Sequence, residues 1–304
     1  MTRPTHQQLR WQTLAYGMFC HFGINTFYGH GWSDGTLSPR GFNPTRLDAR
    51  QWVETAQAAG MRYLVFTAKH HDGFCLWPSD TTDYSVRASP FRGGRGDVVA
   101  ELAQACRDAN MPLGLYLSPL DRHEPCYADP PAYDRFYARQ LAELCARYGP
   151  LFEIWFDGAG PEGRIYNWDL IMEVVDRHQP EALVFNMGRP SIGWVGNEDG
   201  QAADPNYYAV CEQAVSAHPR ARGAAKPTYL PAECDVSLRR GWFWQPDEGA
   251  TRKSVEHLLA IYYRSVGLGA NLLLNVPPDR SGLLDGGDRE RLLSLAAALR
   301  QRFA

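Results

Sequence analysis

Short apolar runs and longer amphipathic segments alternate along almost the whole chain. A short apolar run bounded by turn residues is typical of a buried β-strand, and an apolar stripe that repeats about every 3.6 residues indicates a helix. We expect strands over residues 17–21, 63–67, 113–117, 151–156, 182–186, 228–231 and 272–275, with a further short strand at 194–195.

The segments between these runs carry recognisable helix ends. Asp48 and Gln51 form a capping pattern and Gly60 supplies a stop, so one helix is expected between them. Further helices are expected over residues 97–110, 133–148, 168–178, 252–266 and 288–302. Strands that alternate with helices favour parallel β/α units, and about eight units would close into a (β/α)8 TIM-type barrel, regular or irregular. A doubly wound open sheet is the alternative.

The chain length and the net charge limit the number of domains and the classes of partner. The chain has 304 residues, and a (β/α)8 barrel takes about 250. No internal repeat, low-complexity tract or linker divides the sequence, so we expect a single domain over residues 1–304. The net charge of −3 gives no reason to expect nucleic acid or an anionic membrane as a partner.

The start of the chain shows no apolar signal region, and no stretch is long enough to span a bilayer. The seven cysteines are odd in number and scattered, which favours reduced thiols over a disulfide framework. We therefore expect a cytoplasmic protein without a membrane partner. The sequence has no signature of an oligomeric state.

Polar side chains fall where several predicted strands end. Asp157 follows the apolar run 151–156, and His21, His70, His71 and Tyr116 lie at the ends of earlier strands. In a β/α barrel the carboxyl ends of the strands carry the active site, so these residues are expected to converge there. The alternative for Asp157 is a residue that only caps the following turn.

The adjacent pair His70 and His71 is open to three interpretations. As neutral imidazoles they would hydrogen-bond a polar ligand, or one of them would be a structural histidine. A metal-dependent hydrolase would use both with Asp157 as ligands, but the chain lacks the His-x-His, His-Glu-x-x-His and Cys-x-x-Cys spacings of common metal sites. We expect neither a metal nor a cofactor.

Two motifs resemble known sites without their structural context. Gly31 to Gly35 matches the Gly-x-Ser-x-Gly pattern around Ser33, but loop sequence lies on both sides, whereas a serine-hydrolase nucleophile needs a strand-to-helix turn. Ser33 is interpreted as a turn residue, and a serine esterase remains a weak alternative. The glycine-rich stretch 91–96 precedes a helix and could bind a phosphate, but Asp97 at the start of that helix would repel the anion. We interpret the stretch as a surface loop.

Glu198 and Glu233 also lie at or just beyond strand signals. Retaining glycosidases need two carboxyl groups about 5–5.5 Å apart, one ionised to attack the sugar and one protonated to release the leaving group. Solvated loop carboxylates are the alternative. Trp77, Trp155 and Trp242 would suit the apolar face of a sugar ring, although core packing accounts for most tryptophans.

Five segments, in order across nearly the whole chain, resemble the family 29 glycoside hydrolases, the retaining α-L-fucosidases. They are residues 19–25, 69–77, 114–119, 153–158 and 271–278. The resemblance favours the barrel over the open sheet and implies that Asp157 is the nucleophile. It also implies a fucose pocket lined by His21, His70, His71, Tyr116 and Trp155, in a catalytic domain that acts on fucosylated oligosaccharides. A catalytically silent sugar-binding barrel is the competing possibility.

Residues 193–198 and 231–243 resemble the subgroup that cleaves α-1,3/1,4-linked fucose from branched glycans. This likeness implies that Glu198 is the general acid/base, with Glu233 as the fallback. We expect further substrate contacts from Trp32, Trp77, Glu233 and Trp242. Relatives often carry an acidic residue just before the first-loop tryptophan, Trp32, where this chain has Gly31. Many relatives also carry a β-sandwich after the barrel, which we do not expect here.

Overall fold

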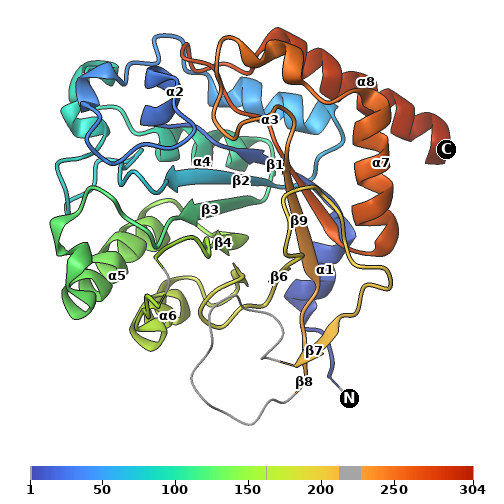
Figure 1. Cartoon of the computed structure of the whole chain (residues 1–304), viewed down its shortest axis with the longest axis horizontal. Helices are drawn as coiled ribbons and strands as arrows, with labels where there is room; N and C mark the ends of the chain where they lie inside the picture. Colours follow the sequence, from blue (N-terminus) through green and yellow to red (C-terminus); the bar gives the residue numbers. More distant parts are fainter. Residues whose placement is uncertain (1, 162, 212–226, 304) are drawn as a thin grey trace.

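The computed structural model of the protein describes residues 2–161, 163–211 and 227–303 (Figure 1). Eight parallel strands form one sheet in the order β5-β4-β3-β2-β1-β10-β9-β6. They are β1 (Tyr16–Cys20), β2 (Leu64–Lys69), β3 (Leu113–Leu117), β4 (Glu153–Trp155), β5 (Leu183–Phe185), β6 (Gly193–Trp194), β9 (Ala232–Ser237) and β10 (Asn271–Asn275). A parallel bridge between Phe185 and Ile192 brings the two sheet edges together. The sheet is a nearly closed barrel, so the predicted TIM-type fold is confirmed and the open sheet is wrong.

Helices lie around the outside of this barrel (Figure 1). The longer ones are α3 (Ala49–Ala58), α4 (Val98–Asp108), α5 (Pro130–Arg147), α6 (Trp168–His178), α7 (Val255–Ser265) and α8 (Gly286–Phe303). Asp48 and Asp97 accept hydrogen bonds from the first-turn amides of α3 and α4, as their positions in the sequence predicted. All six predicted helices are confirmed, with ends shifted by a few residues. None of the helices in the described residues has the length and apolarity needed to cross a bilayer.

Two further helices escaped the pattern analysis, α1 (His6–Leu14) and the short α2 (Ile24–Tyr28). Most residues of α1 are polar, so its sequence carries only a weak apolar stripe. Its Trp11 and Leu14 are nevertheless buried. They pack with the side chains inside the barrel, at the amino-terminal ends of the strands.

The prediction of a barrel strand at 228–231 was wrong. Residues Pro227–Tyr229 form β8, which pairs antiparallel with β7 (Ala209–Cys211) in a separate two-stranded sheet. The barrel strand is β9, which begins at Ala232. In β9 the polar Glu233, Asp235 and Ser237 alternate with apolar residues, so it lacks the continuous apolar run by which the other strands were recognised.

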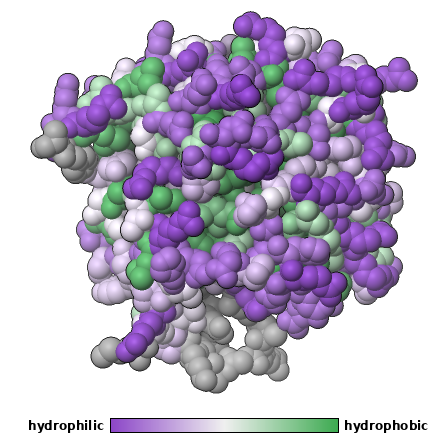
Figure 2. Space-filling view, turned by 180° about the vertical axis from the view of Figure 1, so that it is seen from behind, coloured by the Kyte–Doolittle hydropathy of each residue, from purple (hydrophilic) through white to green (hydrophobic). Residues whose placement is uncertain are grey.

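The core has two parts, separated by the wall of the barrel. Aliphatic and aromatic side chains fill the space between strands and helices. Inside the barrel, Phe19, Tyr63, Tyr116, Trp155 and Phe185 form a mainly aromatic core. Seen from behind, the surface is mostly hydrophilic, with hydrophobic side chains between the polar ones near the centre (Figure 2). The aromatic interior forms the base on which the candidate site is built.

Candidate active site

A narrow cavity lies where the carboxyl ends of the barrel strands meet. It encloses about 310 Å³ of empty space, its open mouth included. Its lining residues are Phe19, His21, Trp32, His70, His71, Tyr116, Trp155, Asp157, Glu198, Asp235 and Trp242. Because parallel strands bring their carboxyl ends to one edge, residues far apart in the chain meet here. All but two of the predicted site residues line this cavity.

Asp157 follows β4 and is partly exposed in the cavity, with 26% of its side chain accessible. The Tyr116 hydroxyl donates a hydrogen bond to its Oδ2 over 3.0 Å, and the Ala159 amide donates to its Oδ1 over 2.6 Å. His71 Nε2 lies 3.8 Å from the same Oδ2. These donors stabilise the negative charge and hold the carboxylate in one orientation, which suits a nucleophile.

Three histidines form one wall of the cavity. His21 Nδ1 lies 2.9 Å from Asn275 Oδ1, and His71 Nδ1 lies 2.6 Å from Ser118 Oγ. The His70 ring stacks on the Tyr116 ring, with centroids 5.6 Å apart. Burial lowers the pKa of all three, that of His21 to about 3, so the imidazoles are neutral at physiological pH. Neutral imidazoles are suited to bind uncharged hydroxyl groups.

Glu198 lies at the mouth of the cavity on the loop after β6, and its side chain is exposed. Trp242 Nε1 donates a hydrogen bond to its Oε2 over 3.2 Å. The loss of water on its cavity side raises the pKa of Glu198, and the charge of Asp157 acts in the same direction. This carboxyl group is therefore protonated to a higher pH than an ordinary glutamate, as a general acid requires.

Two residues that line the cavity, Phe19 and Asp235, were not predicted as site residues. Asp235 lines the cavity, is 4% exposed and accepts a hydrogen bond from Trp194 Nε1 over 2.7 Å. Burial raises its pKa well above the usual value. The polar–apolar alternation of β9 was the signal that could have identified it. Arg122 stacks over the exposed Trp32 ring at 4.9 Å, and no pattern in the sequence indicated this contact.

Most of the chain, from the loop after β1 to the last helix, matches a known family. A family model described as Alpha-L-fucosidase matches residues 28–302. The chain belongs to the α-L-fucosidase family. Alpha-L-fucosidase 1 of Arabidopsis thaliana is 45% identical over 299 residues, which cover 94% of this chain and 58% of the plant protein. The chain thus spans less than two thirds of the length of this relative.

Solved structures of the fucosidase family agree with the fold. A glycoside hydrolase 29 family member from an unknown rumen bacterium is 36% identical with a TM-score of 0.91, over 98% of this chain and 57% of the other. A Ruminococcus gnavus GH29 fucosidase, determined in complex with fucose, is 32% identical with a TM-score of 0.88. That match covers 99% of this chain and 68% of the other.

Two predicted site residues, Trp77 and Glu233, lie outside the cavity. Trp77 is fully buried in the core between strands and helices, and its Nε1 donates to Glu143 Oε2 over 2.6 Å. Glu233 is fully buried near the start of β9, at the amino-terminal end of the barrel. Neither lines the cavity, which corrects the expectation that both contact the substrate. For Glu233 the error follows from the misplaced strand.

The competing chemistries find no support in the described residues. No group of three or more His, Cys, Asp or Glu side chains among them is arranged to hold a metal ion. Ser33 Oγ is buried and has no hydrogen-bond partner within the described part of the chain, so no base there activates it. A serine-hydrolase site at Ser33 is therefore not formed.

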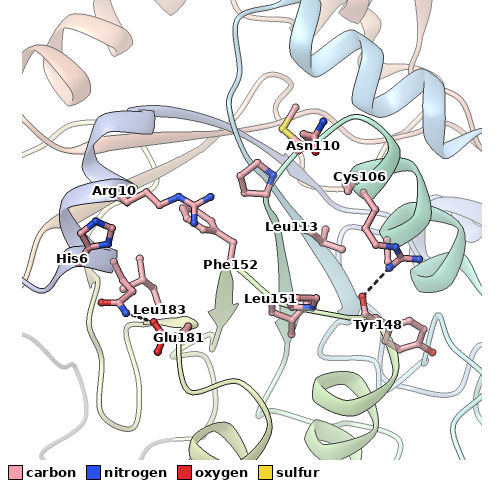
Figure 3. Close-up of a pocket in the computed structure, with 16 residues that line it drawn as sticks. His6, Arg10, Cys106, Asn110, Leu113, Tyr148, Leu151, Phe152, Glu181 and Leu183 are labelled. Atoms are coloured by element: carbon pink, nitrogen blue, oxygen red, sulfur yellow. Dashed lines mark hydrogen bonds between the residues drawn. The ribbon is translucent and has the colours of Figure 1, made fainter.

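A second cavity lies at the amino-terminal end of the barrel, between α1, the end of α4 and the starts of β3, β4 and β5 (Figure 3). It encloses about 1360 Å³, its opening included. Figure 3 shows Arg10 beside Phe152 and a hydrogen bond at Tyr148. Glu181 is the one carboxyl group among its lining residues. This cavity therefore lacks the two acids that glycoside hydrolysis requires.

Proposed function

We propose that the chain is a retaining exo-α-L-fucosidase that hydrolyses terminal α-1,3/1,4-linked fucose from oligosaccharides. One observation carries the proposal. Asp157, held by the Tyr116 hydroxyl and the Ala159 amide, shares a single cavity with Glu198, whose pKa is raised. An oriented carboxylate beside a carboxyl group that stays protonated is the combination that a double displacement needs.

In the first step Asp157 attacks the anomeric carbon of fucose. The bond to the leaving oxygen breaks, Glu198 gives its proton to that oxygen, and a covalent fucosyl-enzyme forms. In the second step Glu198 accepts a proton from water, the water attacks the same carbon, and Asp157 is released with fucose. Each carboxyl group returns to its initial state, so the cycle needs neither a metal nor a cofactor.

The remaining cavity residues fit a small polyhydroxylated ring. His21, His70 and His71 offer neutral ring nitrogens to hydroxyl groups, while Trp155 and Trp242 offer aromatic faces to the apolar side of the sugar. The choice of fucose is supported by the Ruminococcus gnavus relative that was determined in complex with fucose. We propose that residues 1–304 form one catalytic domain that carries all of these groups.

The proposed linkage rests on two segments, residues 193–198 and 231–243, which resemble the α-1,3/1,4 subgroup. They contribute Glu198, Asp235 and Trp242 to the cavity. Of these, Glu198 is exposed and Trp242 is half-buried, so both lie towards the mouth of the cavity, where the sugar next to fucose would be held, because an exo-enzyme holds the terminal ring innermost. This placement supports a role for both segments in linkage choice.

The test is hydrolysis of an aryl α-L-fucoside beside Lewis-type and 2′-linked fucosyl oligosaccharides. We expect release of fucose from the aryl and Lewis-type compounds, with α-fucose as the first product seen by NMR. Initial β-fucose would exclude retention, and cleavage of the 2′-linked compounds alone would exclude the linkage. Binding of fucose without release from any compound would instead favour the silent sugar-binding barrel.

A further inference from the structure

A second pair of carboxyl groups lies inside the barrel, beneath the cavity. Glu153 and Glu233, near the starts of β4 and β9, are both fully buried. The Tyr63 hydroxyl donates to Glu233 Oε1 over 2.6 Å, and Trp155 Nε1 donates to Glu233 Oε2 over 3.0 Å. Trp11 Nε1 donates to Glu153 Oε2 over 3.2 Å. The mechanism above uses neither carboxyl group.

The pair is arranged to share one proton. Glu153 and Glu233 are in side-chain hydrogen-bonding contact with each other, and two carboxyl groups in such contact in a buried site cannot both be ionised. Each oxygen of Glu233 already accepts a hydrogen bond, whereas no N–H or O–H donor among the other described residues reaches Glu153 Oε1, which leaves that oxygen available to carry the shared proton. Burial and the charge of Glu233 raise the pKa of Glu153 well above its usual value. Glu153 is therefore the protonated member, and it donates to Glu233.

Glu233 is connected to the cavity through Trp155. The Trp155 indole is bound to Glu233 at Nε1, and its ring lines the cavity. The same ring stacks on Phe185 at 3.9 Å and on Tyr116 at 5.3 Å between centroids. Tyr116 in turn donates to Asp157. A displacement of the indole would therefore move both the sugar-facing surface and the support of Asp157.

We propose that Glu233 is a positioning residue that fixes the Trp155 indole at the base of the cavity, and that Glu153 serves it as a hydrogen-bond donor. This role rests on the proposed function for its effect on turnover, and it differs from the acid/base role that the sequence left open for Glu233. The hydrogen-bond pattern makes the two glutamates unequal, which gives a sharp test.

Glu153→Gln and Glu233→Gln form the matched pair of variants. In Glu153→Gln the amide donates to Glu233 as the carboxyl proton did, and its oxygen still accepts from Trp11, so kcat/KM should stay within about twofold of wild type. In Glu233→Gln an NH₂ group replaces one carboxylate oxygen. This NH₂ group would face the hydroxyl of Tyr63 or the indole N–H of Trp155, and the hydrogen bond between the two would be lost. We expect kcat/KM to fall by roughly 10–100-fold, since small misplacements in a site cost that much.

The fall in kcat/KM in Glu233→Gln should be the same for aryl fucosides with good and with poor leaving groups, because a positioning residue does not supply a proton to the leaving group. A larger loss for poor leaving groups, or rescue by azide, would assign Glu233 an acid/base role and overturn the proposal. An equal fall in kcat/KM in Glu153→Gln and Glu233→Gln would overturn the assignment of the shared proton to Glu153.

Trp155→Phe removes the indole N–H that donates to Glu233 and leaves both carboxyl groups of the pair in place. It should reproduce the fall in kcat/KM, and Glu233→Gln added to it should cost about twofold or less, because the bond is already absent. Fully additive losses would show that Glu233 does not act through Trp155. This variant also keeps the proposal testable where Glu233→Gln does not fold.

Near-UV circular dichroism gives a readout that does not depend on activity. The stack of Trp155, Phe185 and Tyr116 should produce a signal that changes in Glu233→Gln and persists in Glu153→Gln. If the wild type cleaves no fucoside while this difference is seen, the proposed function fails and the positioning role stands. If the wild type is active and the spectra of both variants match it, the positioning role fails alone.

Discussion

Replacing Glu198 by alanine tests the proposed acid separately from folding. The side chain is exposed and accepts a hydrogen bond from Trp242 Nε1 over 3.2 Å. Surface substitutions of this kind change the free energy of unfolding by about 0.5 kcal/mol or less. For a chain of 304 residues that corresponds to about 1 °C in Tm. Any large loss of activity in this variant therefore reports on chemistry.

The expected loss depends on the leaving group. General acid catalysis contributes about 10²–10⁴-fold, equivalent to about 3–5 kcal/mol of activation free energy. An alkoxide from an oligosaccharide needs the proton and should show the full loss in the Glu198→Ala variant. A dinitrophenolate leaves without a proton, so formation of the fucosyl-enzyme should be nearly unchanged while its hydrolysis, which lacks the base, becomes slow.

Azide makes the assay decisive. It needs no base, so it should attack the accumulated intermediate of Glu198→Ala, restore turnover of the dinitrophenyl fucoside and yield α-fucosyl azide. Asp199→Ala is the matched control, because it removes the adjacent exposed carboxylate and leaves the acid in place; its activity should stay within about twofold. An equal loss for both leaving groups in Glu198→Ala, or rescue only in Glu233→Ala, would refute the assignment of Glu198.

The raised pKa of Glu198 also predicts the shape of the pH profile. The acid must be protonated to act, so a raised pKa extends activity to higher pH, and activity falls as the pH passes through that pKa. In Glu198→Ala this alkaline fall should disappear for the dinitrophenyl fucoside. A fall that persists unchanged would assign it to another group.

Three further variants test other parts of the structure. Asp157→Ala should lower turnover at least about a thousandfold, because the nucleophile is lost, with an unchanged far-ultraviolet circular dichroism spectrum. Burial raises the pKa of Asp72 to about 7, so its ionisation is unfavourable in the folded state and stability falls as the pH rises from about 4 towards 7. Asp72→Asn should remove that fall, giving a higher Tm than wild type near pH 8 and no gain near pH 4. Gly17→Ala would place a Cβ 2.6 Å from the Tyr63 ring, and this overpacking should lower the free energy of unfolding by about 1–3 kcal/mol and Tm by roughly 2–5 °C.

Each of these expectations has a contrary outcome. Turnover of Asp157→Ala within tenfold of wild type would leave the nucleophile unassigned. A Tm of Asp72→Asn that follows the wild-type pH dependence would mean that another buried group titrates. A wild-type Tm for Gly17→Ala would show that Tyr63 moves aside without cost, and would weaken the view that its hydrogen bond to Glu233 is rigid.

Local patterns predicted most elements because the causes are local. Asp48 and Asp97 cap α3 and α4 through hydrogen bonds to amides two or three residues away, so a short window of sequence contains both partners. Most barrel strands are buried on both faces and read as continuous apolar runs. The position of Asp157 at a strand end followed from such a run.

The elements that the sequence did not predict correctly share a different cause. The alternation in β9 reflects a polar interior at this strand, where Glu233 and Asp235 face partners from other strands. The helix α1 is held by burial of Trp11 inside the barrel, not by an apolar stripe of its own. In both cases the partner that stabilises the segment lies far along the chain, so no local window contains the signal.

The sequence by itself determined most of the segments that form helices and strands and most of the side chains at the carboxyl ends of the strands, because hydrogen bonding and burial repeat within each of these segments. Only the tertiary structure decided which carboxyl groups face each other. Closure of the barrel brings Glu233 to Trp155, 78 residues away, and brings Glu198 to the cavity of Asp157. That choice depends on the register between strands, since a shift of one residue turns a side chain from the interior of the barrel to the helices.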